Sequence, residues 1–469
     1  MGRRPLLFNS YIFLFGFLPV AYLVFWSLRS ASSRYVWLTV TGYVFYGYWD
    51  PRFCLLMAFS TLVSYTAGLG FLFAKTQRAR NVILIIPITV DLLLLGFFKY
   101  TRFLLESVVD VAQSLGYSYH VAIPEIVLPV GISFYTFHTI SYIVDAYRGT
   151  IRPTRNLFEF SAYVSLFSQL VAGPIVRFRQ IEQDLENLGS ADRARWLPLG
   201  ISYFVYGLAE KVLLADALAN LVDPALAQYQ ELSTAGAWLA MIGYSMQLYF
   251  DFCGYSDMAI GLGYLFGLRI PLNFNSPYKA LDPSDFWRRW HISLSLFLRD
   301  YLYIPLGGNR YGRSATFRNL LITMLLGGLW HGANWTFVLW GAYHGALLIA
   351  YHLAAAPWDR LPSAARQLAT FALVLVGWVL FRSTDLNMAA NLLNTMFLPR
   401  GGLLIGDPLA WTTLLAIAVS WAMLGPNAED IHRDFRWSDR HGLALAVTFG
   451  ACLAIMAGHA NSPFLYFQF

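Results

Sequence analysis

One uncharged run constrains the fold of this chain more than any other feature. Residues 320–356 are 37 consecutive positions without aspartate, glutamate, lysine or arginine, and they include His331 in the stretch "LGGLWHGANW". A helix that crosses a bilayer needs only about 20 mostly apolar residues, so this run must turn or break. The natural breaking residues are Gly327, Gly328, Gly332 and Asn334. We therefore expect His331 to lie deep in the protein, beside an irregular point of the backbone.

Apolar runs of spanning length recur along all 469 residues. The chain is 57% hydrophobic and 13% charged, whereas a soluble domain carries about 25% charged residues. We predict an all-α polytopic membrane protein that forms one integral-membrane domain over 1–469, with about 11 transmembrane helices plus re-entrant and interfacial helices. One of the expected spans begins near Phe286. Residues 102–116 are typical of an amphipathic surface helix.

Charge and cysteine content exclude some classes of partner. The net charge of +6 is scattered over short loops, which suits membrane lipid headgroups better than nucleic acid. With the N-terminus outside, the inner loops up to residue 155 hold eight basic residues and the outer loops hold four, which favours that orientation. Cys54, Cys253 and Cys452 lack metal or redox spacing, so we expect packing residues and no metal site.

Ionisable side chains inside apolar runs are costly in a bilayer, so each needs a role or a partner. For most of this set we favour internal ion pairs or helix-end anchors, which applies to Asp91, Lys99, Asp145, Glu210, Lys211, Asp251 and Asp257. The segment "SQLVAGPIVRFRQ" contains a Gly173–Pro174 break and is typical of a hairpin that re-enters the membrane.

The most polar stretch is residues 273–312. Asp282 before Pro283 predicts a helix start, with Asp285 acting like a capping-box acid. The helix that follows carries Arg288 and Arg289 among tryptophans. It suits either an interfacial amphipathic helix or the cytoplasmic wall of a pocket where arginines meet a phosphorylated donor.

His331 is a candidate general base. A neutral imidazole is the side chain best able to take a proton from a hydroxyl near neutral pH, and Trp330 and Trp335 would supply apolar walls. The alternative is a histidine that hydrogen-bonds across helices, as we expect for His138, His344 and His352. We favour the role of His331 as a functional residue over a structural hydrogen bond, because ionisable groups within a membrane are functional by default.

Two motifs in this region resemble the membrane-bound O-acyltransferase (MBOAT) family. They are "NFNSPYKALDPSDFWRRWHISLSLFLRDYLYIPLGGNR" and "LLGGLWHGANW". More narrowly, they resemble a bacterial branch of this family, whose members modify alginate and teichoic acids. Three further motifs agree with that branch: "PVGISFYTFHTISYIVDAYRG", "LVAGPIVRF" and "YFDFCGYSDMAIGLG". The resemblance covers nearly the whole chain, with a motif core at about 126–350. It implies helices around a central funnel or tunnel.

The resemblance also implies site residues. His331 matches the family's catalytic histidine, and His291 matches a second histidine on the cytoplasmic side. The residues expected near the donor or substrate are Arg288, Arg289, Trp330, Asn334 and Asp285.

The implied reaction is O-acyl transfer, with acetyl as the first choice of acyl group. The donor would be a cytoplasmic thioester, acetyl-CoA or an acyl-carrier thioester, with no bound cofactor. The acceptor would be hydroxyls of an extracytoplasmic polysaccharide such as alginate, cellulose or another exopolysaccharide. The implied partners are an extracytoplasmic serine-hydrolase-like (SGNH-type) protein and a polysaccharide synthase or secretion complex.

Other functions stay open at this point. D-alanyl transfer to teichoic acid and O-acetylation of peptidoglycan belong to the same family. A polymer export channel or transporter would predict an internal repeat, but "PVGISFY" and "PLGISYF" echo one another without matching flanks.

The tail at 461–469, "NSPFLYFQF", is unusually aromatic for a chain end. It suits an anchor in the membrane interface, where tyrosine is common. It also resembles a C-terminal aromatic-tyrosine motif of bacterial acyltransferase systems, which implies that Tyr466 carries the acyl group between the membrane enzyme and its partner.

Overall fold

The computed structural model describes residues 6–117, 123–404, 406–433, 435–458 and 464–465. These residues form helices and loops, and the only strand-like pairing among them is one isolated bridge between Leu232 and Leu403. The predicted all-α class is confirmed. Internal contacts divide the chain into two units, Met1–Trp196 with Gly263–Ile270 and Leu197–Leu262 with Pro271–Phe469. The single domain expected over 1–469 stays a prediction.

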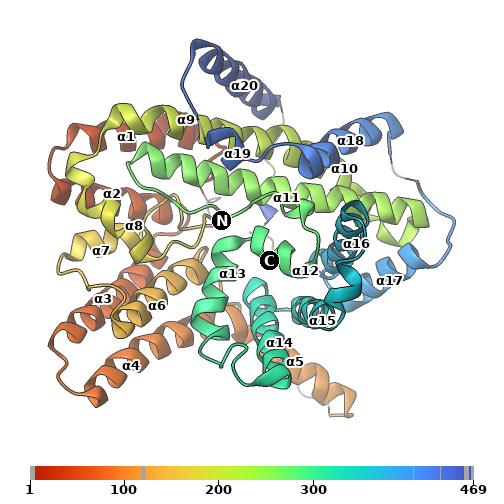
Figure 1. The fold of residues 1–469 in the computed structure, drawn as a ribbon, viewed down its shortest axis with the longest axis horizontal. Helices are drawn as coiled ribbons and strands as arrows, with labels where there is room; N and C mark the ends of the chain where they lie inside the picture. Colours follow the sequence, from red (N-terminus) through yellow and green to blue (C-terminus); the bar gives the residue numbers. More distant parts are fainter. Residues whose placement is uncertain (1–5, 118–122, 405, 434, 459–463, 466–469) are drawn as a thin grey trace. The chain divides into compact units, whose positions relative to one another are not determined.

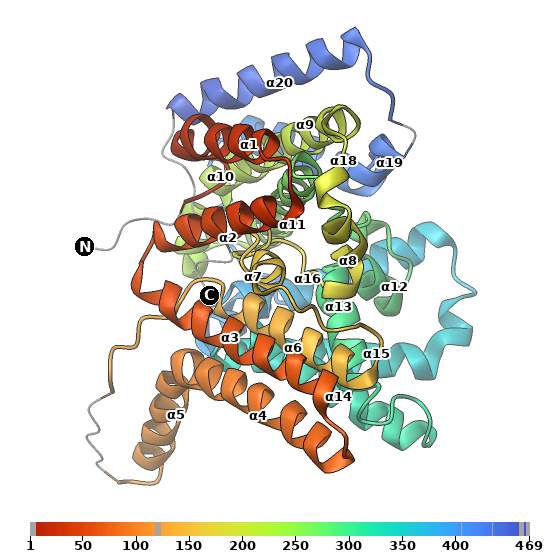
Figure 2. The ribbon, with the colours of Figure 1, turned by 90° about the vertical axis from the view of Figure 1, so that its left-hand side faces the viewer.

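The first unit is built around three long helices that lie side by side, α3, α4 and α6 (Figure 2). The helix predicted at 102–116 is present as α5 and continues from α4 through one π-helical turn. The elements of this unit are η1 Ile12–Phe17, α1 Leu18–Ser27, α2 Ala31–Gly47, α3 Arg52–Phe73, α4 Gln77–Leu95, η2 Gly96–Tyr100, α5 Thr101–Ser114, α6 Ile132–Arg148, α7 Leu157–Val164, α8 Phe178–Glu186 and η3 Leu188–Ser190.

An irregular segment crosses the interior of the first unit. Residues 165–177, around the Gly173–Pro174 pair, form no helix, and every one of them is buried. The Gln169 amide donates to the carbonyl of Tyr163 at 2.6 Å. Non-helical backbone in a buried segment is stable only where protein or a polar cavity surrounds it. The hairpin that re-enters the membrane stays a prediction.

The second unit holds the polar stretch and the uncharged run. Helices α14 and α15 lie side by side in it (Figure 1). Helix α9 starts within the last residues of the first unit, and α11 ends in its second segment. The elements are α9 Arg193–Ala209, η4 Glu210–Ala215, α10 Asp216–Ala227, η5 Tyr229–Glu231, α11 Thr234–Leu265, η6 Pro277–Lys279, α12 Pro283–Arg289, α13 Ile292–Leu298, η7 Arg299–Tyr303, α14 Gly312–His331, α15 Trp335–Trp358, α16 Ser363–Arg382, α17 Leu386–Phe397, α18 Pro408–Leu424, α19 Ala428–His432 and α20 Asp439–Gly458.

The uncharged run breaks where the sequence predicted. Helix α14 ends at His331, Gly332 is extended, and the Asn334 side chain caps α15 by accepting the N–H of Thr336 at 3.0 Å. Gly327 and Gly328, which we expected to break the run, lie inside α14. Gly328 has another role. It allows α14 and α15 to touch, since a Cβ at this position would lie 2.2 Å from the Phe337 carbonyl oxygen. Small residues are typical where membrane helices approach closely.

Six helices among the described residues are long and apolar enough to cross a membrane: Arg52–Phe73, Gln77–Ser114, Arg193–Ala227, Trp335–Trp358, Ser363–Arg382 and Asp439–Gly458. Ile12–Ser27 and Pro408–Leu424 are shorter apolar helices. The expected number of about 11 crossings is therefore not confirmed by these helices. The span expected from Phe286 is absent, because α12 and α13 are only seven residues each.

Candidate active site

His331 lies at the C-terminal end of α14 and is nearly enclosed. His331 is 4% exposed. The centroid of its ring lies 5.1 Å from that of the Trp340 ring and 5.3 Å from that of the Phe381 ring. Trp330, the preceding residue, contacts it at 5.1 Å. The tryptophan surroundings expected from the sequence are present for Trp330, whereas Trp335 is 51% exposed.

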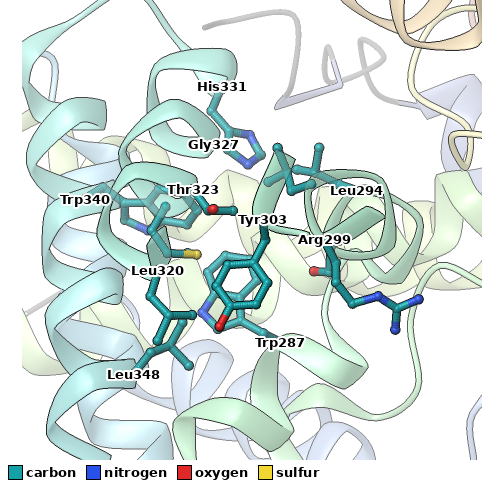
Figure 3. A pocket seen from close by; sticks show the side chains of 13 residues that line it. Trp287, Leu294, Arg299, Tyr303, Leu320, Thr323, Gly327, His331, Trp340 and Leu348 are labelled. Carbon is teal, nitrogen blue, oxygen red and sulfur yellow. The ribbon is translucent and has the colours of Figure 1, made fainter. Parts of the chain in front are cut away.

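A cavity of about 220 Å³ begins at His331. Figure 3 shows the His331 ring at one end of the lining side chains and Trp287 with Leu348 at the other end. The walls are mostly apolar, and α12 to α15 and η7 supply them: Trp287, Leu294, Ser295, Leu298, Arg299, Tyr303, Leu320, Thr323, Met324, Gly327, His331, Trp340 and Leu348. A mostly apolar space next to an imidazole can shield a reactive group from water.

His291 joins α12 to α13 in an unusual backbone conformation. Its φ and ψ of 43° and 55° are left-handed, and it is fully buried. A residue other than glycine with positive φ is uncommon, although histidine is among the enriched types. This turn brings the His291 ring centroid to 6.2 Å from that of His331 and 6.1 Å from that of Trp330. The two histidines predicted as a site therefore lie together.

The His291 ring is held from two sides. Its Nδ1 lies 3.0 Å from Oδ1 of Asn273, and the Phe252 ring packs edge-on against it at 4.7 Å between centroids. Burial lowers the pKa of His291 to about 3, so the ring is neutral near pH 7.

The predicted cap of α12 is confirmed. The Asp282 carboxylate accepts the N–H of Asp285 at 2.7 Å, and Pro283 opens the helix. Asp285 also forms ion pairs with Arg289 at 3.0 Å and Arg288 at 3.5 Å. The Arg288 side chain is 66% exposed, so it is accessible to a ligand.

Asn334 has another role in the structure. Its Nδ2 donates to the Thr384 carbonyl at 2.8 Å, and its Oδ1 caps α15. Both ends of this amide are used within the protein, and Asn334 does not line the cavity.

Lys211, Asp251 and Asp145 form internal ion pairs of the kind that the sequence favoured. Lys211 Nζ lies 2.6 Å from Asp216 and 2.5 Å from Asp251, and Asp145 pairs with Arg179 at 3.7 Å. Asp91 instead accepts hydrogen bonds from the hydroxyls of Ser60 and Thr139, each at 2.7 Å.

Elsewhere in the second unit, Glu210, Cys253 and Asp257 are buried and place their donor atoms within 4.8 Å of one another. Carboxylate and thiolate groups are ligands for divalent metals, so this donor set could hold one. It lies on η4 and α11, and none of its members lines the cavity at His331.

The chain's last described residues enter the interior of the second unit. Phe464 is 1% exposed and Leu465 is 4% exposed, and the Leu465 N–H donates to Asp251 at 2.9 Å. The Phe464 ring lies 6.0 Å from that of Phe252, the residue that also contacts His291. Tyr466 lies outside the described residues.

The family assignment rests on residues 150–389, which match the model of MBOAT, the membrane-bound O-acyltransferase family. The match covers just over half of the chain and includes both histidines. This chain belongs to the membrane-bound O-acyltransferase family. It is accordingly an enzyme, a membrane-bound O-acyltransferase, and the resemblance read from its motifs is confirmed.

Curated relatives agree with this membership. The chain is 46% identical over 398 residues to the probable alginate O-acetylase AlgI of Pseudomonas aeruginosa, covering 84% of this chain and 75% of that protein. It is 40% identical over 499 residues to the probable alginate O-acetylase AlgI of Pseudomonas putida, covering 99% and 100%. It is 36% identical over 425 residues to the peptidoglycan O-acetyltransferase of Helicobacter pylori, covering 83% and 80%.

Two residues of this site were not predicted from the sequence. Asn273 stands at the start of the polar stretch, 18 positions before His291. Its role is visible only in the folded chain, where its side chain contacts the His291 ring. Phe252 lies in an apolar helix, and nothing in the neighbouring sequence distinguishes it from residues that only pack. The polar character of 273–312 was the one signal that could have found Asn273.

Proposed function

We propose that this chain acetylates an extracytoplasmic polysaccharide with an acyl group taken from a cytoplasmic thioester. The observation that carries the proposal is a buried histidine, His331, at the end of an apolar cavity with His291 at 6.2 Å between ring centroids. Relatives named alginate O-acetylase at 40% and 46% identity support acetyl as the group and a polysaccharide as the acceptor.

The proposed reaction uses His331 as the general base. Its imidazole takes the proton of the acceptor hydroxyl while that oxygen attacks the thioester carbonyl carbon. The tetrahedral intermediate collapses, the carbon–sulfur bond breaks, and the thiol leaves with the proton returned by His331. General base catalysis of this kind contributes about 10²- to 10⁴-fold in rate. The apolar walls keep out water that would hydrolyse the thioester.

The cavity also suits the arm of a thioester donor, acetyl-CoA or an acyl-carrier thioester. Trp287 and Trp340 line it, and their indole Nε1 atoms are buried without a hydrogen-bond acceptor among the described residues. Each could donate to a carbonyl oxygen of the donor. Arg288 and Arg289, held by Asp285, are the proposed contacts for donor phosphate. Trp330 would act by packing against His331, and Asn334 would act by fixing the start of α15.

The C-terminal segment is proposed to pass the acyl group onward. In this route the Tyr466 phenol is the hydroxyl that attacks the thioester: His331 takes its proton, the carbon–sulfur bond breaks, and the thiol leaves with that proton, which leaves a tyrosyl ester. An SGNH-type partner serine would then attack the ester carbonyl, and its proton would pass to the leaving phenolate and restore Tyr466. The phenol pKa near 10 suits both steps. The neighbouring Leu465, bonded to Asp251, supports a tail that reaches the enzyme's interior.

The cellular setting follows from the same proposal. The enzyme would lie in the bacterial inner membrane with its N-terminus outside, next to a polysaccharide synthase or secretion complex. D-alanyl transfer to teichoic acid and peptidoglycan O-acetylation are the alternatives, and the Helicobacter pylori relative at 36% identity favours the second of them. Alginate, cellulose and other exopolysaccharides are the candidate acceptors.

Replacement of His331 by Ala tests the proposal. In cells that carry only this variant, the acetyl content of the secreted polysaccharide should fall to the level of a gene deletion, because the hydroxyl loses its base. Membrane abundance of the variant, measured by immunoblot, should equal that of the wild type. A normal acetyl content with His331→Ala would contradict the proposal, and a changed cell-wall acetyl content instead would favour the peptidoglycan alternative.

A further inference from the structure

The hydrogen bonds around Asn273 determine which nitrogen of His291 carries a proton. Asn273 Oδ1 faces three groups: His291 Nδ1 at 3.0 Å, Ser293 Oγ at 2.8 Å and the Ser293 backbone N–H at 3.3 Å. A backbone N–H can only donate, so the amide atom that faces this group is the oxygen. On the other side, Asn273 Nδ2 donates to Ser256 Oγ at 3.1 Å, which is compatible with the same orientation.

An oxygen acceptor requires a donor from the imidazole. Nδ1 of His291 therefore carries the hydrogen. Burial lowers the pKa of His291 to about 3, so the ring has one N–H only, and Nε2 keeps a free lone pair.

That lone pair has no donor among the described residues. His291 Nε2 is buried and forms no hydrogen bond with any described residue. Its surroundings are the rings of Phe252, Trp330 and His331. A buried acceptor without a donor is unfavourable, and such atoms are retained where a ligand or water supplies the missing hydrogen.

We propose that Asn273, together with Ser293, is a positioning residue that holds His291 as the Nδ1–H tautomer, so that Nε2 accepts a hydrogen bond from an N–H or O–H group of a reactant. In this state His291 cannot donate to the thioester oxygen. Its role is to hold a donor group, such as an amide N–H of the acyl donor's arm or the acceptor hydroxyl. The role of His291 in binding a reactant depends on the proposed function. The tautomer of His291 does not, because it is a property of the protein without substrate.

Nitrogen NMR of the imidazole tests the tautomer directly. The full chain is prepared in lipid with ¹⁵N-labelled histidine, and the spectrum of His291→Gln is subtracted to isolate the His291 signals. We expect a protonated Nδ1 and an unprotonated Nε2. A protonated Nε2 would overturn the inference even if the enzyme is active, and the expected tautomer would stand even if the proposed reaction fails.

Three substitutions test the positioning role. Asn273→Ala should convert the single Nδ1–H signal of His291 into a mixture of the two tautomers. It should also lower acyl transfer by roughly tenfold or more, the scale on which groups that orient a histidine act. Asn273→Asp keeps an oxygen at this position and should restore both the Nδ1–H signal and most of the transfer. Asn309→Ala, at an exposed asparagine, is the control and should leave both readouts unchanged. If Asn273→Ala retains the wild-type tautomer, or if Asn273→Asp fails to restore it, Asn273 does not position His291.

Discussion

At the scale of single residues, one hydroxyl separates the two roles open to Tyr466. Tyr466→Phe keeps the aromatic ring that an interfacial anchor needs and removes the oxygen that a tyrosyl ester needs. If the tail is a relay, polysaccharide acetylation should be lost, because no nucleophile remains at this position. The acetyl content of polymer from cells with only this variant measures the effect. Full acetylation would leave the anchor role alone.

The site residues differ in how far the sequence could reveal them. His331 was predictable because a titratable side chain inside an uncharged run is costly, and Gly332 and Asn334 indicated the break beside it. The pairing of His331 with His291 depended on family resemblance, since 40 positions separate them. The polar stretch 273–312 pointed to the neighbourhood of Asn273, but the role of Asn273 and that of Phe252 depend on contacts with His291 that only the folded chain creates.

At the scale of elements, the contact between α14 and α15 positions His331, and Gly328 makes it possible. Gly328→Ala would place a Cβ 2.2 Å from the Phe337 carbonyl oxygen, which forces the two backbones apart. Overpacking of this kind costs about 1–3 kcal/mol, so we expect a lower thermal unfolding midpoint in detergent and reduced acyl transfer.

Gly450→Ala in α20 is the matched control for this variant. A Cβ at Gly450 has no atom within 4 Å, and alanine is favoured over glycine inside a helix by about 0.5–1 kcal/mol. Its unfolding midpoint should be unchanged or higher. An equal midpoint for both variants would show that the helix contact tolerates a methyl group.

Helix ends were more predictable than helix continuity. The Asp282 cap of α12 and the Asn334 cap of α15 followed from side chains that satisfy exposed backbone groups, and these are local effects. The sequence pattern missed the interruption at His291. Its left-handed backbone is held by the Asn273 contacts and by Ile292 N–H, which donates to the Asn273 carbonyl at 2.8 Å, and these are not local.

At the scale of the whole molecule, orientation in the membrane decides which end of the enzyme meets the donor. The proposed orientation places the loop at 75–80 in the cytoplasm and the loop at Asp50 outside, because basic residues gather in inner loops. A periplasmic phosphatase fused after Arg78 should be inactive, and the same enzyme fused after Asp50 should be active. The opposite pattern would reverse the orientation.

The central claim is acyl transfer from a thioester with His331 as the base. The most direct test is an assay in isolated membranes that contain the polymer and the partner proteins. The measured quantity is the initial rate at which labelled acetyl passes from acetyl-CoA into the polysaccharide. His344→Gln, at another buried histidine of the α14–α15 pair, is the control and should retain the rate. The account predicts that His331→Gln lowers the rate by about 10²-fold or more at equal membrane abundance. An unchanged rate with His331→Gln would contradict it.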